Sequence, residues 1–428
     1  MVKDETPARR MSVDNTETPE GRFAMRTTRI AAVLLAAATL TGAASAQVSN
    51  DVVKLGVTND QASIYSAAGG FGAVIATRMA VEDAGGSVLG KKVEVVFADN
   101  QNKPDIGVSI VRRWLDTENV DVIVDGGSSA VGMAVQAVTR EKNKLFLISG
   151  SGTHALTNQN CSATGFQWSW DTYGVAAGTA TELMKQKLDT WFFITADYTF
   201  GHLLEAQASE VVQKHGGKVL GAVRVPFNTS DFSSFLLQAQ TSGAKVIALA
   251  TAGGDTTNAL KQAREFGLDR KGQKVAALFM NITDVDALGL EAAQGLIITT
   301  SFYWDRTEAS REFSKRFFEK HKRMPTFLTA GAYSAVTHYL KAVKEIGTDD
   351  TDKVAAQMRK TRINDPMTEN GWIREDGRVM RDFYVVQVKT PAESKYPWDY
   401  YKIIGTVPAE EAALPLSRSE CKLVKKTN

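Results

Sequence analysis

The sequence predicts an α/β fold in which parallel sheets are covered by helices and divided between two lobes. Runs of apolar, β-branched residues alternate with helical patterns along almost the whole chain. The strands show little polar–apolar alternation, as expected when helices cover both faces of a sheet. Predicted strands lie at 52–58, 93–98, 120–125, 145–149, 191–196, 219–225, 245–251, 275–280, 295–303 and 382–389. Predicted helices lie at about 72–84, 105–117, 130–141, 174–187, 201–215, 232–242, 256–266, 284–290, 308–321, 330–346 and 352–360.

An internal repeat in the sequence supports the division into two lobes. Nine or ten strands are more than one doubly wound sheet usually takes. Residues 93–127 and 219–254 share one order: a strand, an Asn, an Asp at a helix start, a second strand and Gly-Gly. Each of these two aspartates, Asp105 and Asp231, can accept free backbone N–H groups at its helix start. We therefore expect two similar α/β lobes.

The first 46 residues have the pattern of an export signal. A basic segment starting at Met25 precedes an apolar run at 30–40 and the triplet Ala44-Ser45-Ala46. This order predicts a secretory signal peptide cleaved after Ala46. The run is too short to span a bilayer. Residues 1–24 are interpreted as an over-extension, which leaves Met1 and Met25 as alternative starts.

Length, charge and cysteine content limit the possible function, domain number and disulfide bonding of the chain. The chain has 428 residues and a formal net charge of +2, which gives no support to nucleic-acid binding. Its length suits two domains. Two cysteines, Cys161 and Cys421, remain after the predicted export. In an oxidising compartment this even pair predicts one disulfide, with two free thiols as the alternative.

Small and hydroxyl-bearing residues follow the predicted strands. They occur in the stretches 125–132, 149–156, 195–201, 251–258 and 280–284. Ligands of parallel sheets bind beyond the carboxyl ends of strands, where helix N-termini favour anions. Ordinary βα turns have the same composition, so the five stretches together carry the prediction of a ligand cleft.

The stretch "LFLISGSGTHALT" (145–157) is the most pronounced of these. We expect the anionic end of a solute to lie against Ser149–Thr153, with hydrogen bonds from the hydroxyls of Ser151 and Thr153. A bulky residue at Gly152 would then occupy the place of the solute without disturbing the core.

Enzyme and metal signatures are missing from the sequence. There is no G-x-S-x-G elbow, and residues 85–92 resemble a phosphate loop but end in Lys92 and precede a strand. The five histidines lack metal-binding spacing. No catalysis, metal or cofactor is predicted. A hydrolase that uses Ser151 and His154 stays as an alternative.

Several motifs in order resemble a known family. They are "AVEDAGGSVLGKKVEVVFADNQNKP" (80–104), "DVIVDGGSS" (121–129), "LISGSGTHALT" (147–157), "DYTFGH" (197–202) and "LKQAREFGL" (260–268). Over roughly residues 51–405 the chain resembles the type I periplasmic solute-binding proteins of ABC importers, of the branched-chain amino-acid-binding kind.

The resemblance implies two Rossmann-like lobes joined by a three-crossing hinge. The first lobe would be 51–167 with 304–372, and the second 168–303 with 373–428. It also implies a periplasmic monomer that delivers a small solute to ABC permease and ATPase subunits in the inner membrane. A ligand-sensing subunit of a receptor is the alternative.

The resemblance also implies a set of binding residues. Ser128 or Ser129 would hold a solute carboxylate together with the residues after the next strand, and Phe200 stands where the family has an aromatic residue. Thr283 stands where amino-acid binders usually have an acid, so either Asp284 or Asp255 replaces that acid or the solute has no ammonium group. An aromatic or other apolar carboxylate is then the alternative solute. With the aromatics near the cleft, the candidate ligand-binding residues are Tyr65, Ser128, Ser129, Ser151, Gly152, Thr153, Trp170, Tyr198, Phe200, Asp255, Thr283 and Asp284.

Overall fold

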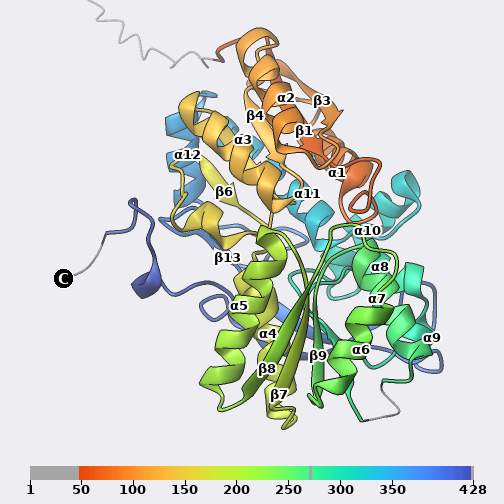
Figure 1. The fold of residues 1–428 in the computed structure, drawn as a ribbon. Coiled ribbons are helices and arrows are strands. Elements are labelled where there is room, and N and C mark those ends of the chain that lie inside the picture. Colours follow the sequence, from red (N-terminus) through yellow and green to blue (C-terminus); the bar gives the residue numbers. More distant parts are fainter. Residues whose placement is uncertain (1–47, 269–271, 426–428) are drawn as a thin grey trace, which may run out of the picture. The chain divides into compact units, whose positions relative to one another are not determined.

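The structure is a computed structural model that describes residues 48–268 and 272–425 (Figure 1). The predicted signal peptide and its cleavage point after Ala46 lie outside the described residues. Within the described part, no helix is both long and apolar enough to cross a membrane.

The first sheet has six strands in the order β2-β3-β1-β4-β5-β6. Its strands are β1 (Val52–Asn59), β2 (Ser87–Val88), β3 (Lys91–Asp99), β4 (Val122–Asp125), β5 (Leu145–Ile148) and β6 (Gly165–Gln167). All pairs are parallel except β2 with β3. The connecting helices are α1 (Gly70–Asp83), α2 (Pro104–Thr117) and α3 (Ser129–Glu141), and the short 3-10 helix η1 (His154–Thr157) follows β5. Every residue of β4 and β5 is buried, which explains their continuous apolar sequence.

The second sheet has four parallel strands in the order β10-β9-β7-β8. They are β7 (Thr190–Ala196), β8 (Lys218–Val225), β9 (Val246–Ala250) and β10 (Lys274–Ala277). The helices of this part are α4 (Thr172–Lys185), α5 (Thr199–Lys214), α6 (Ser233–Thr241), α7 (Gly254–Glu265), α8 (Ile282–Leu288) and α9 (Leu290–Ala293). In Figure 1 these strands and helices are drawn mainly in green.

The strand order confirms that the internal repeat in the sequence corresponds to a repeat in the fold. In the first sheet β3 and β4 flank β1, and in the second β8 and β9 flank β7. The repeated segments 93–127 and 219–254 therefore hold equivalent places in two sheets of the same winding.

The remaining chain returns to both sheets. The helices α10 (Glu308–His321), α11 (Phe327–Ile346) and α12 (Thr351–Lys360) follow, and α10 and α11 pack on α1. The strands β11 (Ile297–Thr300), β14 (Phe383–Val388) and β15 (Tyr401–Val407) form an antiparallel sheet that packs on α4. β15 is an edge strand of this sheet. A two-stranded sheet joins β12 (Trp372–Ile373) and β13 (Val379–Met380).

The crossing segments between the sheets are joined by a buried ion pair. Asp171, just before α4, accepts a hydrogen bond of 2.8 Å from Nε of Arg378, and both side chains are almost fully buried. Nη1 of Arg378 also donates to the carbonyl of Gln167 at 3.2 Å. The lobe borders at 167/168, 303/304 and 372/373 remain a proposal. In that division Asp171 lies just after the first border and Arg378 just after the third, so the ion pair joins two crossing segments.

Short elements were missed by the sequence prediction. The sequence analysis predicted no strand within 85–92, but Ser87–Val88 pairs antiparallel with the start of β3. The three-residue strand β6 was also missed, because "GFQ" is too short for periodicity to identify it.

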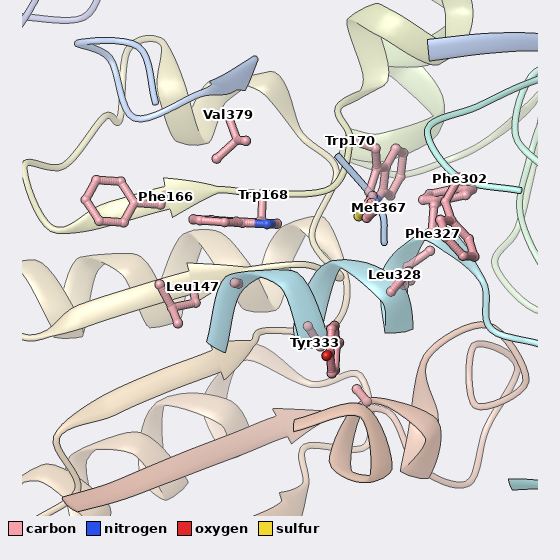
Figure 2. Packing of buried hydrophobic residues seen from close by; sticks show 14 of the residues in the cluster. Leu147, Phe166, Trp168, Trp170, Phe302, Phe327, Leu328, Tyr333, Met367 and Val379 are labelled. Atoms are coloured by element: carbon pink, nitrogen blue, oxygen red, sulfur yellow. The ribbon is translucent and has the colours of Figure 1, made fainter. Parts of the chain in front are cut away.

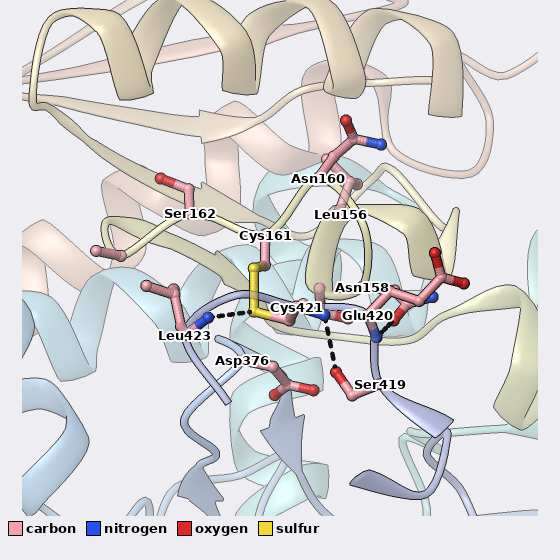
Figure 3. The surroundings of a disulfide bond; sticks show 12 residues. Leu156, Asn158, Asn160, Cys161, Ser162, Asp376, Ser419, Glu420, Cys421 and Leu423 are labelled. Carbon is pink, nitrogen blue, oxygen red and sulfur yellow. Dashed lines mark hydrogen bonds between the residues drawn. A yellow bond between two sulfur atoms is a disulfide. The ribbon is translucent and has the colours of Figure 1, made fainter. Parts of the chain in front are cut away.

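A disulfide joins Cys161 and Cys421, so no described cysteine is free. Figure 3 shows the C-terminal segment beside the loop that follows η1. Next to the bond, the backbone N–H of Glu420 donates to Oδ1 of Asn158 at 2.6 Å. The bridge attaches the segment after β15, which belongs to the antiparallel sheet, to the loop between β5 and β6 of the first sheet.

Removal of this bridge is expected to lower the free energy of unfolding by about 2–4 kcal/mol. The bond closes a loop of 260 residues, and so long a loop restricts the unfolded chain strongly. Urea unfolding of the Cys161→Ser/Cys421→Ser double variant measures the effect, and the parent protein unfolded with a reductant serves as its control. Equal unfolding midpoints for parent and double variant would contradict the prediction.

Candidate functional site

A cavity of about 60 Å³ lies at the carboxyl ends of strands from both parallel sheets. It is lined by Asn59, Asp60, Tyr65, Ala68, Gly69, Gly70, Asp125, Gly127, Ser128, Ser129, Gly150, Gly152, Trp170, Tyr198, Phe200, Ala252, Phe279 and Leu328. This is the place where parallel α/β sheets bind ligands. Among these described lining residues there is no Lys, Arg or His.

Three helices begin at the cavity without a side-chain cap. They are α1, α3 and α5, which start beside the lining residues Gly69, Ser128 and Tyr198. In contrast, α4 and α11 are capped by Asp171 and Thr326. The first N–H groups of an uncapped helix are free to bind a ligand, and the helix dipole favours an anion there.

A sharp turn at the end of β4 shapes the first-sheet side of the cavity. Asp125, Gly126 and Gly127 all have positive φ angles, of 80°, 89° and 73°. A Cβ atom on Gly126 would lie 2.5 Å from the ring of Phe146, so this position requires glycine for two reasons. The turn brings the backbone of Gly127 and the start of α3 to the cavity wall.

Asp125 is the most buried charged group of the wall, at 1% exposure. Its Oδ2 accepts a hydrogen bond of 2.8 Å from Nδ2 of Asn59, and its Oδ1 accepts one of 3.2 Å from the N–H of Gly127. Burial raises the pKa of Asp125 to about 6, although these two bonds act in the opposite direction. The second lining carboxylate, Asp60, instead organises its own loop by accepting from Ser63 and Tyr65.

Aromatic rings form the opposite wall. Trp170 stacks on Phe279, with 4.4 Å between ring centroids, and meets the edges of Phe200 and Phe327. Figure 2 shows Trp170 beside Phe327 and Phe302, close to the first turn of α11. Nε1 of Trp170 is buried and has no hydrogen-bond partner among the described residues. This wall therefore offers a large apolar surface and one unused N–H donor.

Two tyrosines of the cavity wall contact each other. The hydroxyl of Tyr65, from the loop after β1, contacts the hydroxyl of Tyr198, at the start of α5. Phe227 packs edge-on against both rings. Burial raises the pKa of both hydroxyls, so both tyrosines are neutral in the physiological range.

Comparison with known proteins agrees with this architecture. A family profile described as "Periplasmic binding protein" matches residues 52–395, which is well over half of the chain. The chain belongs to the periplasmic binding protein family.

Solved structures resemble this periplasmic binding protein along most of its length. A periplasmic binding protein from Burkholderia mallei is 48% identical, with a TM-score of 0.85 over 88% of this chain and 100% of that one. A branched chain amino acid ABC transporter periplasmic ligand-binding protein from Burkholderia xenovorans LB400 is 39% identical, with a TM-score of 0.80 over 87% and 99%. Among curated relatives, a "Leu/Ile/Val-binding protein homolog 6" of Brucella melitensis is 26% identical and is matched over 69% of this chain and 77% of its own. The fold is that of two-lobed type I periplasmic binding proteins, and the family binds solutes in the periplasm.

The cavity of this periplasmic binding protein contains part of the predicted set. Tyr65, Ser128, Ser129, Gly152, Trp170, Tyr198 and Phe200 all line it. They come from the first and second sheets, so the structure brings together residues that are up to 135 positions apart (200 − 65). Their roles in binding remain a proposal.

The two predicted hydroxyl contacts, of Ser151 and Thr153, stay predictions, and both hydroxyls have other partners in this structure. Ser151 and Thr153 do not line the cavity. Oγ of Ser151 donates to the carbonyls of Gly127 and Ser128, at 2.9 and 3.0 Å. Oγ1 of Thr153 caps η1 by accepting from the N–H of Ala155. Both hydroxyls therefore hold the loops together, and the backbone of Gly150 and Gly152 faces the cavity instead.

Asp255 and Asp284, the two carboxylates predicted to replace the acid of amino-acid binders, also lie outside the cavity, as does Thr283. Asp255 accepts a hydrogen bond of 3.2 Å from the N–H of Asn228. Asp284 accepts one of 2.8 Å from the N–H of Asn281 at the start of α8, and Thr283 belongs to the same first turn. Burial raises the pKa values of Asp255 and Asp284 to about 6. Neither carboxylate lines this cavity, so a role for either of them at the ligand stays a prediction.

Several lining residues were missed by the sequence analysis. Asn59 and Asp125 end their strands, and their polarity at a strand end was a usable signal. Phe279 is apolar, but it too lies at the end of its strand, just beyond β10. Leu328 comes from α11, 161 residues after the end of β6 (328 − 167), the last strand of the first sheet, and nothing in its local sequence marks it.

The hydrolase alternative finds no support in the geometry. The hydroxyl of Ser151 is used by two carbonyls, whereas Nδ1 of His154 lies 2.6 Å from Nε2 of Gln207. No hydrogen bond joins Ser151 to His154 within the described residues, so a nucleophile and its base are not paired. Across 48–268 and 272–425, no group of three or more His, Cys, Asp or Glu residues could hold a metal ion.

Proposed function

We propose that this periplasmic binding protein captures a small organic acid with an apolar, ring-shaped body and delivers it to a membrane permease. The observation that supports this proposal is that one side of the cavity is polar and the other is aromatic. Its first-sheet side presents polar groups and uncapped helix starts, and its second-sheet side consists of Tyr198, Phe200, Ala252 and Phe279 together with Trp170 from the crossing segment. An acid group suits the first side and an aromatic ring the second.

An amino acid is the second candidate. It is favoured by the names of the Burkholderia xenovorans structure and of the Brucella relative. The aligned acid of amino-acid binders is missing from the wall, because Thr283, Asp284 and Asp255 lie elsewhere. An ammonium group would have to use Asp125 or Asp60 on the first-sheet side, beside the helix starts that favour an anion.

A matched set of solutes separates the two candidates. We expect benzoate to raise the melting temperature of the mature protein and to give a calorimetric binding isotherm, because a ligand of the folded state stabilises it by mass action. Benzylamine has the same ring with the opposite charge, and leucine and phenylalanine carry both charged groups. Binding of leucine or phenylalanine, with no response to benzoate or other aromatic acids, would overturn the proposal in favour of an amino acid.

Delivery to a permease needs its own measurement. Cells that lack this protein are expected to lose high-affinity uptake of the labelled solute identified above, and to regain it with the parent gene. Unchanged uptake, together with a lost transcriptional response to the solute, would favour a ligand-sensing subunit instead.

A further inference from the structure

The carboxyl group of Asp125 lies where the proposed function places the anionic end of the solute. It lines the cavity with Gly127, Ser128 and Gly150, between the uncapped starts of α1 and α3. A Cβ atom on Gly150 would overlap Oδ1 of Asp125, so the backbone after β5 lies directly against this carboxyl group. The helix starts and glycines that would suit a solute anion thus already surround the carboxyl group of Asp125.

No cation compensates this carboxyl group. The other titratable side chains among the lining residues are Asp60 and Tyr65 on the loop after β1, and Tyr198 at the start of α5. On β3, Asp99 accepts from the N–H of Gln61 and adds negative charge nearby in the sheet. The described lining residues contributed by α3, by α11 and by the segment after β5 have no ionisable side chain.

A solute carboxylate would therefore meet a second carboxylate in a buried, cation-free place. Two carboxyl groups that share such a site cannot both stay ionised, and one of them binds a proton. Burial already raises the pKa of Asp125 to about 6, against the effect of its hydrogen bonds to Asn59 and Gly127, before any anion arrives. Asp125 is thus the group that gains the proton at small cost.

We propose that Asp125 binds the solute in its protonated form, donating its carboxyl hydrogen to an oxygen of the solute carboxylate, so that binding takes up a proton from solvent wherever free Asp125 is ionised. This inference rests on the proposed function. The overall step is balanced: ionised Asp125, one proton and the solute anion give a complex in which the net charge of the acid pair is −1. Asp125 is then a specificity-determining residue, because a neutral carboxyl selects an acceptor at this point of the solute.

The sign of the pH dependence follows from this proton. Anion binding raises the pKa of Asp125 further, so protons are taken up between the free and the bound pKa. Affinity for the acid is nearly constant below the free pKa of about 6, and falls by up to tenfold per pH unit above it. A cationic solute paired with ionised Asp125 would show the opposite slope.

Calorimetric titration with benzoate from pH 5.5 to 8.5, in two buffers of different ionisation enthalpy, tests the proposal. We expect uptake of close to one proton near pH 7.5 and the fall in affinity above pH 6. Asp125→Asn keeps a donor and suits the positive φ angle, which asparagine tolerates. Its affinity should vary less than twofold over this range and exceed that of the parent at pH 8.5.

Asp284→Asn is the matched control. Asp284 is also buried and its pKa is also raised to about 6, but it lies outside the cavity at the start of α8. This variant should keep the parent's pH slope for benzoate. Benzoate binding without proton uptake in the parent, or an unchanged slope in Asp125→Asn, would overturn the role of Asp125 and leave the proposed function standing. Failure of every aromatic acid to bind, with binding of benzylamine or leucine that strengthens as pH rises, would overturn the proposed function and this inference together.

Discussion

Replacement of Arg378 by methionine is expected to lower the free energy of unfolding by about 3–5 kcal/mol. The substitution leaves the carboxylate of Asp171 buried without its cation, and removes two hydrogen bonds from Nη1 to the carbonyls of Gln167 and Val379. Removing one partner of a buried ion pair costs far more than the pair itself contributes. Equilibrium unfolding in urea measures the loss.

Two further variants make this prediction sharp. Asp171→Asn combined with Arg378→Met removes both charges and keeps a residue that caps α4 well, so the double variant should be more stable than Arg378→Met alone. Arg112→Met is the control, because Arg112 pairs with Glu141 at 2.7 Å on the exposed surface, where such pairs contribute little to stability. Similar losses for Arg378→Met and Arg112→Met would show that the crossing ion pair has no special role.

Replacement of Gly152 by alanine is expected to weaken solute binding by about a hundredfold or more, a loss of about 2.7 kcal/mol. The new Cβ atom would overlap the ring of Trp170, which is nearly buried and stacked on Phe279. The ring must move into the cavity or disturb the aromatic wall. Calorimetry with the solute found for the parent measures the loss.

The same change should also lower stability by about 1–3 kcal/mol, the usual range for overpacking. The earlier expectation that a larger residue at Gly152 leaves folding unaffected is therefore revised, because Trp170 belongs to the main core cluster. Gly254→Ala is the matched control at another helix start, where the nearest atom to a new Cβ is 3.9 Å away. If Gly152→Ala binds and melts like Gly254→Ala, the ring of Trp170 does not form the wall described here.

The fold could be predicted because its signal is repeated in every unit. Each buried strand is a short apolar run, each helix has its own periodicity, and the segments 93–127 and 219–254 repeat one order. Elements of two or three residues, such as β2 and β6, are held by pairing with neighbours in space and have no local pattern of their own.

The site could be predicted only in part, for a different physical reason. Ser128 and Gly152 follow strands, so topology alone brings them to the sheet edge. The orientation of a hydroxyl depends on which partner is nearest: Ser151 found two carbonyls of the neighbouring loop, and Thr153 the N–H of its own turn. The contribution of Leu328 depends on the packing of α11 against α1, which strand-end patterns do not report.

The disulfide also decides what a single cut in the backbone can do. Because Cys161 and Cys421 are 260 positions apart, the bond turns most of the folded chain into one covalent ring. A protease that cleaves one peptide bond inside this ring produces a nicked molecule whose two pieces stay attached. Such a molecule keeps its full mass on a non-reducing gel and separates into fragments only after reduction. In the periplasm, where proteases are present, a single cleavage inside the ring therefore changes the chain only locally. Two cleavages inside the ring are needed to release a fragment.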